Sequence, residues 1–224
     1  MLRMKKYIMV VDVEGTRHGY VYDIGYAIVD LQGNIYETYS AIVSEVFFGM
    51  HDKMSTAYYA DKIPKYGKRV CNRQTVCTDI DTIRQKVFSA MERFKIKTVA
   101  AYNVKYDRNA LNRTISYISD GYVTSFFPAG TIYWDIWGMA CETILKRKSY
   151  TKQAIEKGWI SKKGNIKSRA EYAYKYLSGN DEFEEDHTGL EDVLIETIIL
   201  AATIATHKKM TRTEIPNPWK LIQN

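Results

Sequence analysis

The sequence contains few cysteines and few prolines, and it has no long hydrophobic run. Its three cysteines, Cys71, Cys77 and Cys141, are odd in number and lack companions with metal-ligand spacing, so we expect reduced thiols and neither a disulfide framework nor a zinc ribbon. No stretch approaches the roughly 20 apolar residues that cross a bilayer, and residues 1–6 run into a predicted strand without a cleavable signal. We therefore expect a soluble, cytoplasmic protein with no membrane association.

The excess of positive charge is modest. The 224 residues carry a formal net charge of +6, which permits nucleic-acid binding but does not require it. Lysine and arginine cluster at 62–73, 146–169 and 208–212, whereas 181–186 is acidic. A basic rim around an acidic centre suits a polyanion held against bound metal, although solvated charge on an ordinary surface is the alternative for each cluster.

The pattern of apolar residues predicts one α/β domain. Three strands at 8–15, 22–30 and 35–43 form an antiparallel meander, and the segment 45–78 indicates only short helices and loops. Helices and strands then alternate, which favours parallel pairing. These elements are a helix at 79–94, a strand at 98–102, a helix at 107–118, a strand at 131–134, a helix at 136–145, a small hairpin at 159–166, a helix at 168–177 and a long helix at 188–206.

The first predicted strand carries two carboxylates in an otherwise apolar run. Side chains alternate between the faces of a strand, so Asp12 and Glu14 point the same way from neighbouring positions. Two carboxylates at the end of a central strand repel each other and lose hydration, unless cations or hydrogen bonds compensate. A divalent metal with a preference for oxygen ligands provides such compensation, although a strand end that faces water is the alternative for this motif alone.

Two later segments add groups of the same chemistry. Asp107 begins a helix just beyond the fourth strand, a common location for sites in open α/β sheets. His187 precedes the last long helix, and Asp192 lies about one turn inside it, so the two can converge on one ligand. Glu191 points about 100° away from Asp192 around the helix, which favours Asp192 as the ligand. Taken singly, each is also explained as a helix-end or solvated residue.

In this order, the three segments resemble the DnaQ-like 3′ to 5′ exonucleases of the DEDDh subgroup. That family carries Asp-x-Glu on its first strand, a second Asp after Asn-x-x-(Phe/Tyr)-Asp, and a final His-x-x-x-x-Asp. The resemblance spans roughly residues 7–206. It rests on Asp12-Val13-Glu14, Asn103-Val104-Lys105-Tyr106-Asp107 and His187-Thr188-Gly189-Leu190-Glu191-Asp192.

The resemblance implies an α/β ribonuclease H-like fold, with a five-stranded mixed sheet flanked by helices. It also implies phosphodiester hydrolysis with two divalent cations, Mg²⁺ or Mn²⁺. In the family pattern, Asp12 would bridge both cations, Glu14 and Asp192 would complete the nucleophile-side site, and Asp107 would hold the second cation mostly through water. His187 would act as the general base, for which an imidazole with an unperturbed pKa of about 6.5 is suited.

Substrate contacts are expected beside this centre. Thr16 and Arg17 directly follow the acidic strand and should lie beside the terminal nucleotide, and Asn103 of the second motif is a further candidate substrate-binding residue. Phe47 and Phe48 follow the third strand, where related enzymes place residues that stack on the last bases. Stacking on single strands contributes about 1 to 3 kcal/mol per base. Core packing is the alternative for both phenylalanines.

Two segments depart from the simplest pattern of the family. The segment at 158–177 is rich in lysine and could form a substrate or partner surface. The acidic run at 181–186 stands beside the predicted metal site, where like charge would repel a polyanion unless it points away. We expect an exonuclease domain at 1–210 and a C-terminal extension at 211–224.

The function implied by the resemblance is hydrolysis of single-stranded DNA from its 3′ end to nucleoside 5′-monophosphates, in proofreading or DNA processing. The alternatives are a 3′ to 5′ RNA exonuclease, because the 2′-hydroxyl contacts that distinguish the two polymers are not visible in sequence, and a catalytically idle scaffold that binds replication proteins. The expected partners are single-stranded 3′ ends. A polymerase or other replication partner and a homodimer stay open.

Overall fold

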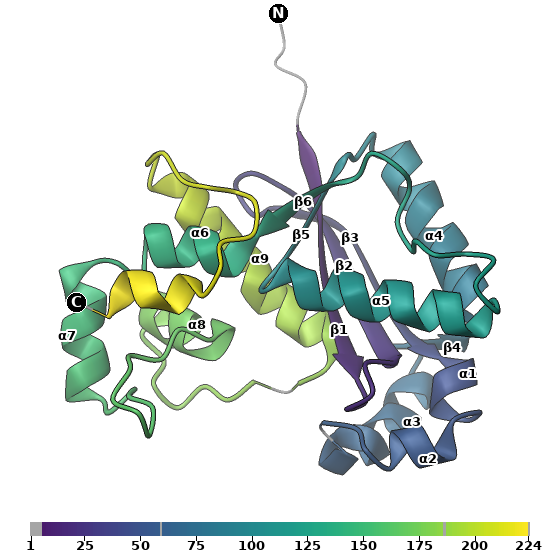
Figure 1. Cartoon of the computed structure of the whole chain (residues 1–224). Helices are drawn as coiled ribbons and strands as arrows, with labels where there is room; N and C mark the ends of the chain where they lie inside the picture. The colour runs from purple at the N-terminus through teal and green to yellow at the C-terminus, as the bar shows by residue number, and fades with distance from the viewer. Residues whose placement is uncertain (1–5, 59, 186, 224) are drawn as a thin grey trace, which may run out of the picture.

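A six-stranded mixed sheet runs through the computed structural model, which describes residues 6–58, 60–185 and 187–223 (Figure 1). The strand order is β4-β3-β2-β1-β5-β6. The first three strands form the predicted antiparallel meander, β5 and β6 run parallel to β1, and β4 runs parallel to β3. The strands are β1 (Tyr7–Gly15), β2 (Val21–Asp30), β3 (Ile35–Val43), β4 (Val76–Thr78), β5 (Thr98–Ala101) and β6 (Ile132–Asp135).

Helices cover both faces of this sheet. One layer consists of α4 (Ile80–Arg93) and α5 (Val104–Ile118), and the other contains α6 (Ile136–Glu142), α7 (Lys148–Glu156), α8 (Ala170–Ser178) and α9 (Gly189–Ala205) (Figure 1). Short elements fill the remainder, namely α1 (Ser44–Phe47), α2 (His51–Met54), η1 (Ala60–Lys62), α3 (Ile63–Cys71) and η2 (Pro218–Ile222). Among the described helices, none is both long enough and apolar enough to cross a bilayer.

The alternation of side chains along β1 divides the core in two. Val11 packs in the cluster that includes α4 and α5, whereas Val10 packs in the cluster that includes α6 and α9. Because the period of a strand is two, Asp12 and Glu14 continue the series of Val10 and face the α9 layer. The sheet therefore presents both carboxylates to the helix that carries the last predicted motif.

The sheet has six strands rather than the predicted five. The additional strand, β4, is only three residues long and pairs with the end of β3, with Ala41 opposite Val76. A strand of three residues is too short to show an alternation of apolar and polar side chains. The sequence pattern therefore does not distinguish β4 from the loops around it. The predicted hairpin at 159–166 is also shorter than expected, since the described pairing is a single bridge between Ile160 and Ile166.

The C-terminal segment folds back on the α6 layer. Ile222 is buried in the core beside α6, and the backbone N–H of Asp135 donates to the carbonyl of Arg212 at 2.7 Å. The Arg212 guanidinium lies 4.3 Å from the centre of the Trp134 ring. This segment thus contacts the end of β6, while the predicted domain boundary at residue 210 stays a prediction.

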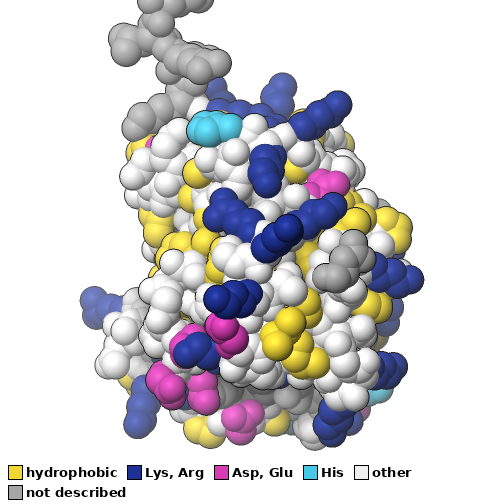
Figure 2. All heavy atoms as spheres, turned by 90° about the vertical axis from the view of Figure 1, so that its left-hand side faces the viewer, with side chains coloured by type: hydrophobic (Ala, Val, Ile, Leu, Met, Phe, Trp, Pro, Cys, Tyr) yellow, Lys and Arg dark blue, Asp and Glu magenta, His cyan; other side chains and the backbone are white. Residues whose placement is uncertain are grey.

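The face that carries α7, α8 and the C-terminal segment is strongly charged. Figure 2 shows Lys and Arg side chains over the middle and upper part of this face, and Asp and Glu side chains gathered below them. The exposed basic residues here include Lys146, Arg147, Lys148, Lys152 and Lys163. Within the lysine-rich segment at 158–177, Lys162, Lys163 and Arg169 are exposed, whereas Lys175 is 9% exposed and pairs with Glu171 at 2.7 Å. The role of this segment as a substrate or partner surface stays a prediction.

Candidate active site

The end of β1 extends beyond its neighbour β5. Only Met9 and Val10 pair with β5, so the following residues of β1 have no strand on that side. The backbone N–H of Val13 instead donates to Oδ1 of Asp107 on α5, at 3.2 Å. This bond fastens Asp107 against the strand between Asp12 and Glu14. The predicted second acidic residue therefore lies next to the first pair.

The start of α5 is fixed by a turn at Asn103. This residue has φ 75° and ψ 53°, in the left-handed region that asparagine tolerates better than most residues. Its N–H donates to Oδ1 of Asp135 at the end of β6, at 3.1 Å. Helix α5 begins at Val104, three residues earlier than predicted, so Asp107 occupies its first turn.

Helix α9 reaches β1 because two glycines let the backbones touch. Gly25 lies opposite Asp12 in the sheet, and a Cβ placed on Gly25 would lie 2.2 Å from the carbonyl carbon of Gly189. Asp23 holds the contact, because its Oδ2 accepts the N–H of Gly189 at 2.9 Å and the O–H of Tyr66 at 2.7 Å. The first turn of α9, with Asp192, is thereby placed over the acidic end of β1.

A second tie holds the beginning of α9 from the side of α3. Arg69 pairs with Glu191 at 3.0 Å and donates to the hydroxyl of Thr188 at 2.9 Å. Arg69 belongs to the basic cluster at 62–73, which the sequence predicts to form part of a basic rim. Its guanidinium is instead engaged in fastening α3 to α9, and Glu191 points to this ion pair rather than to the acidic centre, as the helical spacing predicted.

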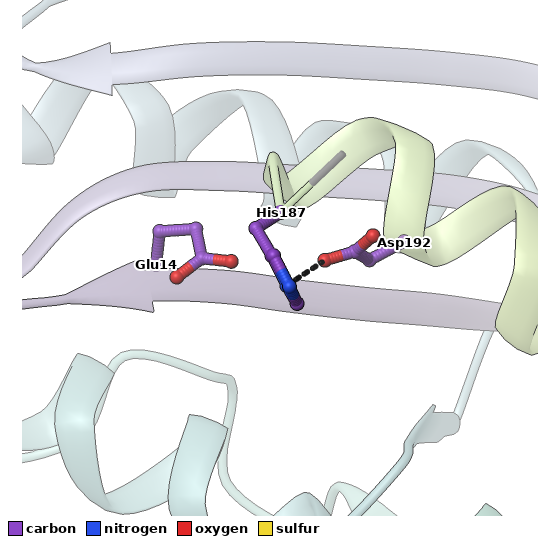
Figure 3. Close-up of side chains that lie close together, drawn as sticks. All are labelled: Glu14, His187 and Asp192. Atoms are coloured by element: carbon purple, nitrogen blue, oxygen red, sulfur yellow. Dashed lines mark ion pairs between the residues drawn. The ribbon is translucent and has the colours of Figure 1, made fainter. Parts of the chain in front are cut away.

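The structure brings the third motif onto the first. Glu14, His187 and Asp192 each place one ligand atom within 4.8 Å of the others. Figure 3 shows the His187 ring between the carboxylates of Glu14 and Asp192. Its Nδ1 lies 3.9 Å from Oδ2 of Asp192 and 3.8 Å from Oε2 of Glu185. One imidazole is thus surrounded by three acidic side chains.

All five residues predicted to be catalytic line one cavity of about 380 Å³. Tyr58, Tyr102, Tyr106 and Trp137 form aromatic walls, and Asn103 lies at its edge. The five residues are Asp12, Glu14, Asp107, His187 and Asp192.

In the part of the chain that the structure describes, no Lys or Arg side chain pairs with Asp12, Glu14 or Asp192 in this cavity. Burial, together with the charges of Asp107 and Asp23, raises the pKa of Asp12 well above its ordinary value. Burial and the charge of Asp12 likewise raise the pKa values of Glu14 and Asp192. Within the described residues, Oδ2 of Asp12 and Oδ1 of Asp192 are buried and accept no hydrogen bond. Hard oxygen ligands that lack partners and repel each other fit a divalent cation.

Part of the acidic run before His187 belongs to this cavity. Glu185 lies in the cavity wall with a side chain that is 12% exposed, and its pKa is raised to about 7 by burial and by the charge of Glu171. Arg169, at the edge of the same cavity, acts in the opposite direction. Asp181 instead points away and pairs with Lys157 at 2.5 Å, and Asp186 lies outside the described residues.

Glu196 is a further acidic residue of the cavity that the sequence analysis missed. It follows Asp192 by four residues on α9, and this spacing puts both side chains on one face of the helix. The same helical argument that selected Asp192 over Glu191 could therefore have found it. Glu185 and Asp23 carried no comparable signal, because neither belongs to a spaced pair with the predicted ligands.

The predicted nucleotide contacts Thr16, Arg17 and Asn103 line a second cavity of about 370 Å³. It also contains the basic side chains of Lys105 and Arg113. Asn103 lines both cavities, as do two tyrosines, so the basic and the acidic cavities are neighbours. Thr16 is fully buried, which leaves Arg17 as the exposed member of this pair.

The two phenylalanines do not line either of these cavities in the described part of the chain. Phe47 packs on Tyr22 and Tyr66, with ring centres 6.5 and 5.9 Å away, and so occupies the core position that was its alternative. Phe48 is 59% exposed and contacts Phe47 edge-on. The stacking role of Phe48 stays a prediction.

Comparison with known proteins shows the fold of this chain. No protein-family model matches it, and no curated protein does. E. coli exonuclease I in complex with a 5cy-dT13 oligonucleotide superposes with a TM-score of 0.53 at 13% identity, over 91% of this chain and 43% of that chain. The same enzyme in complex with a dA16 oligonucleotide superposes with a TM-score of 0.52 at 14% identity, over 97% of this chain and 42% of that chain. The chain thus spans less than half of these proteins, and the likeness confirms the predicted α/β ribonuclease H-like fold.

Proposed function

We propose that this chain is a metal-dependent 3′ to 5′ exonuclease of the DEDDh type, which shortens single-stranded DNA to nucleoside 5′-monophosphates. The observation that carries the proposal is the convergence of Asp12, Glu14, Asp107, Asp192 and His187 on one cavity at the end of β1. The superposition on exonuclease I bound to DNA oligonucleotides supports it at the level of the fold. A binding scaffold would have no need for so many costly buried acids in one place.

Four carboxylates, those of Asp12, Glu14, Asp107 and Asp192, would hold two divalent cations, Mg²⁺ or Mn²⁺. When bound, such cations activate a water nucleophile and stabilise the departing 3′ oxygen. The protein supplies the geometry. Val13 orients Asp107 through its N–H, and the contact between Gly25 and Gly189 sets the depth at which Asp192 enters the cavity.

His187 would take the proton of the attacking water at its imidazole ring. Its Nδ1 lies within 4 Å of carboxylate oxygens of Glu185 and Asp192. Negative charge at this distance stabilises the positive charge that the ring gains with the proton. Glu185 therefore supports the protonated histidine, which gives one residue of the acidic run a role in the reaction.

The neighbouring basic cavity would hold the nucleic-acid backbone. Arg17, Lys105 and Arg113 provide cations where the strand enters, and Asn103 connects this cavity to the acidic one. Tyr58 and Tyr106 line both cavities and are 56% and 37% exposed, so part of each side chain is available for stacking on bases. The strand would thus be held by its phosphates and bases while its 3′ end reaches the carboxylates.

Beyond this reaction, we propose that residues 1–210 form the exonuclease domain and that 211–224 is an extension packed on α6. A polymerase or other replication partner and a homodimer remain predictions of the sequence.

The test is digestion of matched single-stranded DNA and RNA oligomers labelled at the 5′ end, with Mg²⁺ or Mn²⁺, beside Asp12→Ala. We expect a ladder that shortens from the 3′ end, is absent with Asp12→Ala and is absent with an oligomer whose 3′ end is blocked. The polymer that is degraded faster decides between DNA and RNA. Binding of either oligomer without digestion would support the scaffold instead.

A further inference from the structure

Glu196 is a buried acid that the proposed reaction does not yet use. It lies on α9, is only 2% exposed, and lines the same cavity as Asp12, Asp107 and Asp192. Glu196 does not belong to the predicted set of four acids, which has two on the first strand, one in the second motif and one in the last. Ile195 and Ile199 of α9 are buried in the core near Glu196.

One oxygen of Glu196 lacks a partner. Its Oε2 is buried and accepts no hydrogen bond within residues 6–58, 60–185 and 187–223. No ion pair between Glu196 and a described Lys, Arg or His side chain is present. Asp23 is a useful contrast, because two donors satisfy one of its oxygens and tie α9 to the sheet. Glu196 performs no such structural task with Oε2.

The buried oxygen of Glu196 requires neutralisation, by a cation or by a proton. An ionised carboxylate that is buried without a partner costs several kcal/mol, and other acids in the same cavity increase the cost. After burial itself, the charges of Asp12 and Asp107 are the main reason that the pKa of Glu196 is raised. Asp12 and Asp107, the carboxylates proposed to hold the second cation, line the same cavity as Glu196, whose Oε2 is unpartnered among the described residues.

We propose that Glu196 is a fifth carboxylate ligand of the metal centre and binds, through Oε2, the cation held by Asp12 and Asp107. This inference rests on the metal centre of the proposed function. Glu196 and Asp192 then lie on the same face of α9, where Asp192 would bind the first cation and Glu196 the second. The five carboxylates together carry one charge more than two divalent cations neutralise, so both cations should bind firmly.

The rival explanation is a protonated Glu196 that serves only as a hydrogen-bond donor to a neighbouring acid. A glutamine at this position would keep both the shape and a donor. Glu196→Gln therefore separates the two roles, because it removes only the charge and the metal-binding oxygen. Glu156→Gln is the matched control, since Glu156 is exposed on α7 and its ion pair with Lys152 lies on the surface.

The experiment is a titration of the metal-free proteins with Mn²⁺, followed by the electron paramagnetic resonance signal of free Mn²⁺. Loss of groups that merely orient metal ligands costs about 10- to 100-fold in affinity, so we expect loss of a ligand to weaken the second Mn²⁺ site at least about tenfold in Glu196→Gln. Glu156→Gln should bind as the wild type does. Thermal unfolding gives a second readout, in which Mn²⁺ should raise the midpoint of Glu196→Gln less than that of the wild type.

The outcomes separate this inference from the proposed function. Two Mn²⁺ sites of unchanged affinity in Glu196→Gln would overturn the role of Glu196 and leave the exonuclease intact. A wild type that binds no Mn²⁺ would overturn both. If Glu196→Gln does not fold, Glu196→Asp replaces it, because it keeps the charge on a shorter side chain. We again expect the second Mn²⁺ site to bind more weakly than in the wild type. A Mn²⁺ affinity equal to that of the wild type would count against the proposal.

Discussion

A methyl group at Gly25 should separate α9 from the sheet. The Cβ of Gly25→Ala would lie 2.2 Å from the backbone of both Gly189 and Leu190, whereas ordinary contact begins at 3.4 Å. Both neighbours are backbone atoms within a helix that cannot rotate away as a side chain would. The start of α9 must therefore retreat by about 1.2 Å, the difference between these two distances.

The expected cost follows from this displacement. Forcing one extra carbon into a packed interior costs about 1 to 3 kcal/mol. For a domain of this size, each kcal/mol lowers the unfolding midpoint by about 2 to 4 °C, so we expect a decrease of about 2 to 12 °C. The displacement also draws Asp192 away from Glu14, and a misplacement of about 1 Å can cost about 100-fold in turnover.

Gly67→Ala is the matched control for this experiment. Gly67 lies on α3, and an added Cβ there meets no atom within 4 Å, so the same substitution should leave stability equal or slightly increased. Thermal unfolding in the presence of EDTA, Mn²⁺ affinity and exonuclease rate would be measured for both variants. If Gly25→Ala equals Gly67→Ala in all three, the contact between β2 and α9 does not position the site.

Three further predictions concern the surrounding groups. His187→Ala should lose most turnover while Mn²⁺ affinity stays within a few-fold of wild type, and a large loss of affinity in the titration would make His187 a metal ligand instead. Tyr66→Phe removes one hydrogen-bond donor from the buried carboxylate of Asp23 and should lower the free energy of unfolding by about 1 to 3 kcal/mol. Urea denaturation measures this change, and an unchanged midpoint would contradict the role of this bond. Because the pKa of Glu185 is raised to about 7 from 4.5, its folded form keeps a proton that the unfolded chain releases. The contribution of Glu185 to the stability of the metal-free protein is thus complete below pH 4.5 and falls as the pH rises to 7. Unfolding in EDTA between pH 4.5 and 8 would measure this decrease. A stability that rises with pH over this interval would refute the prediction.

Local periodicity was sufficient to predict most of the fold. The alternation along β1 gave the common face of Asp12 and Glu14, and the helical repeat distinguished Asp192 from Glu191. Both predictions depend only on the geometry of one element, which neighbouring residues determine. The order of elements predicted parallel pairing and placed Asp107 just beyond the strand at 98–102. The pairing of β1 with β5 and the position of Asp107 between the two acids were seen only in the structure.

Features that depend on two distant segments could not be predicted in this way. Asp23 and Gly25 look like ordinary strand residues until α9 is placed on them, and β4 is too short to show a period. Phe47 is equally apolar whether it packs in the core or stacks on a base, so only its contacts with Tyr22 and Tyr66 distinguish the two. Tertiary contact, rather than local pattern, decides each of these cases.

The bond between Asp23 and Gly189 joins residues that are 166 positions apart. During synthesis on the ribosome, the β1 and β2 hairpin emerges long before α9, and at that stage its acids have neither Asp192 nor His187 beside them. The cavity that Asp12, Glu14, His187 and Asp192 line can therefore be complete only after the long helix has left the exit tunnel and docked. Under the proposed function, a chain built in this order cannot hydrolyse nucleic acid before its last long helix is in place.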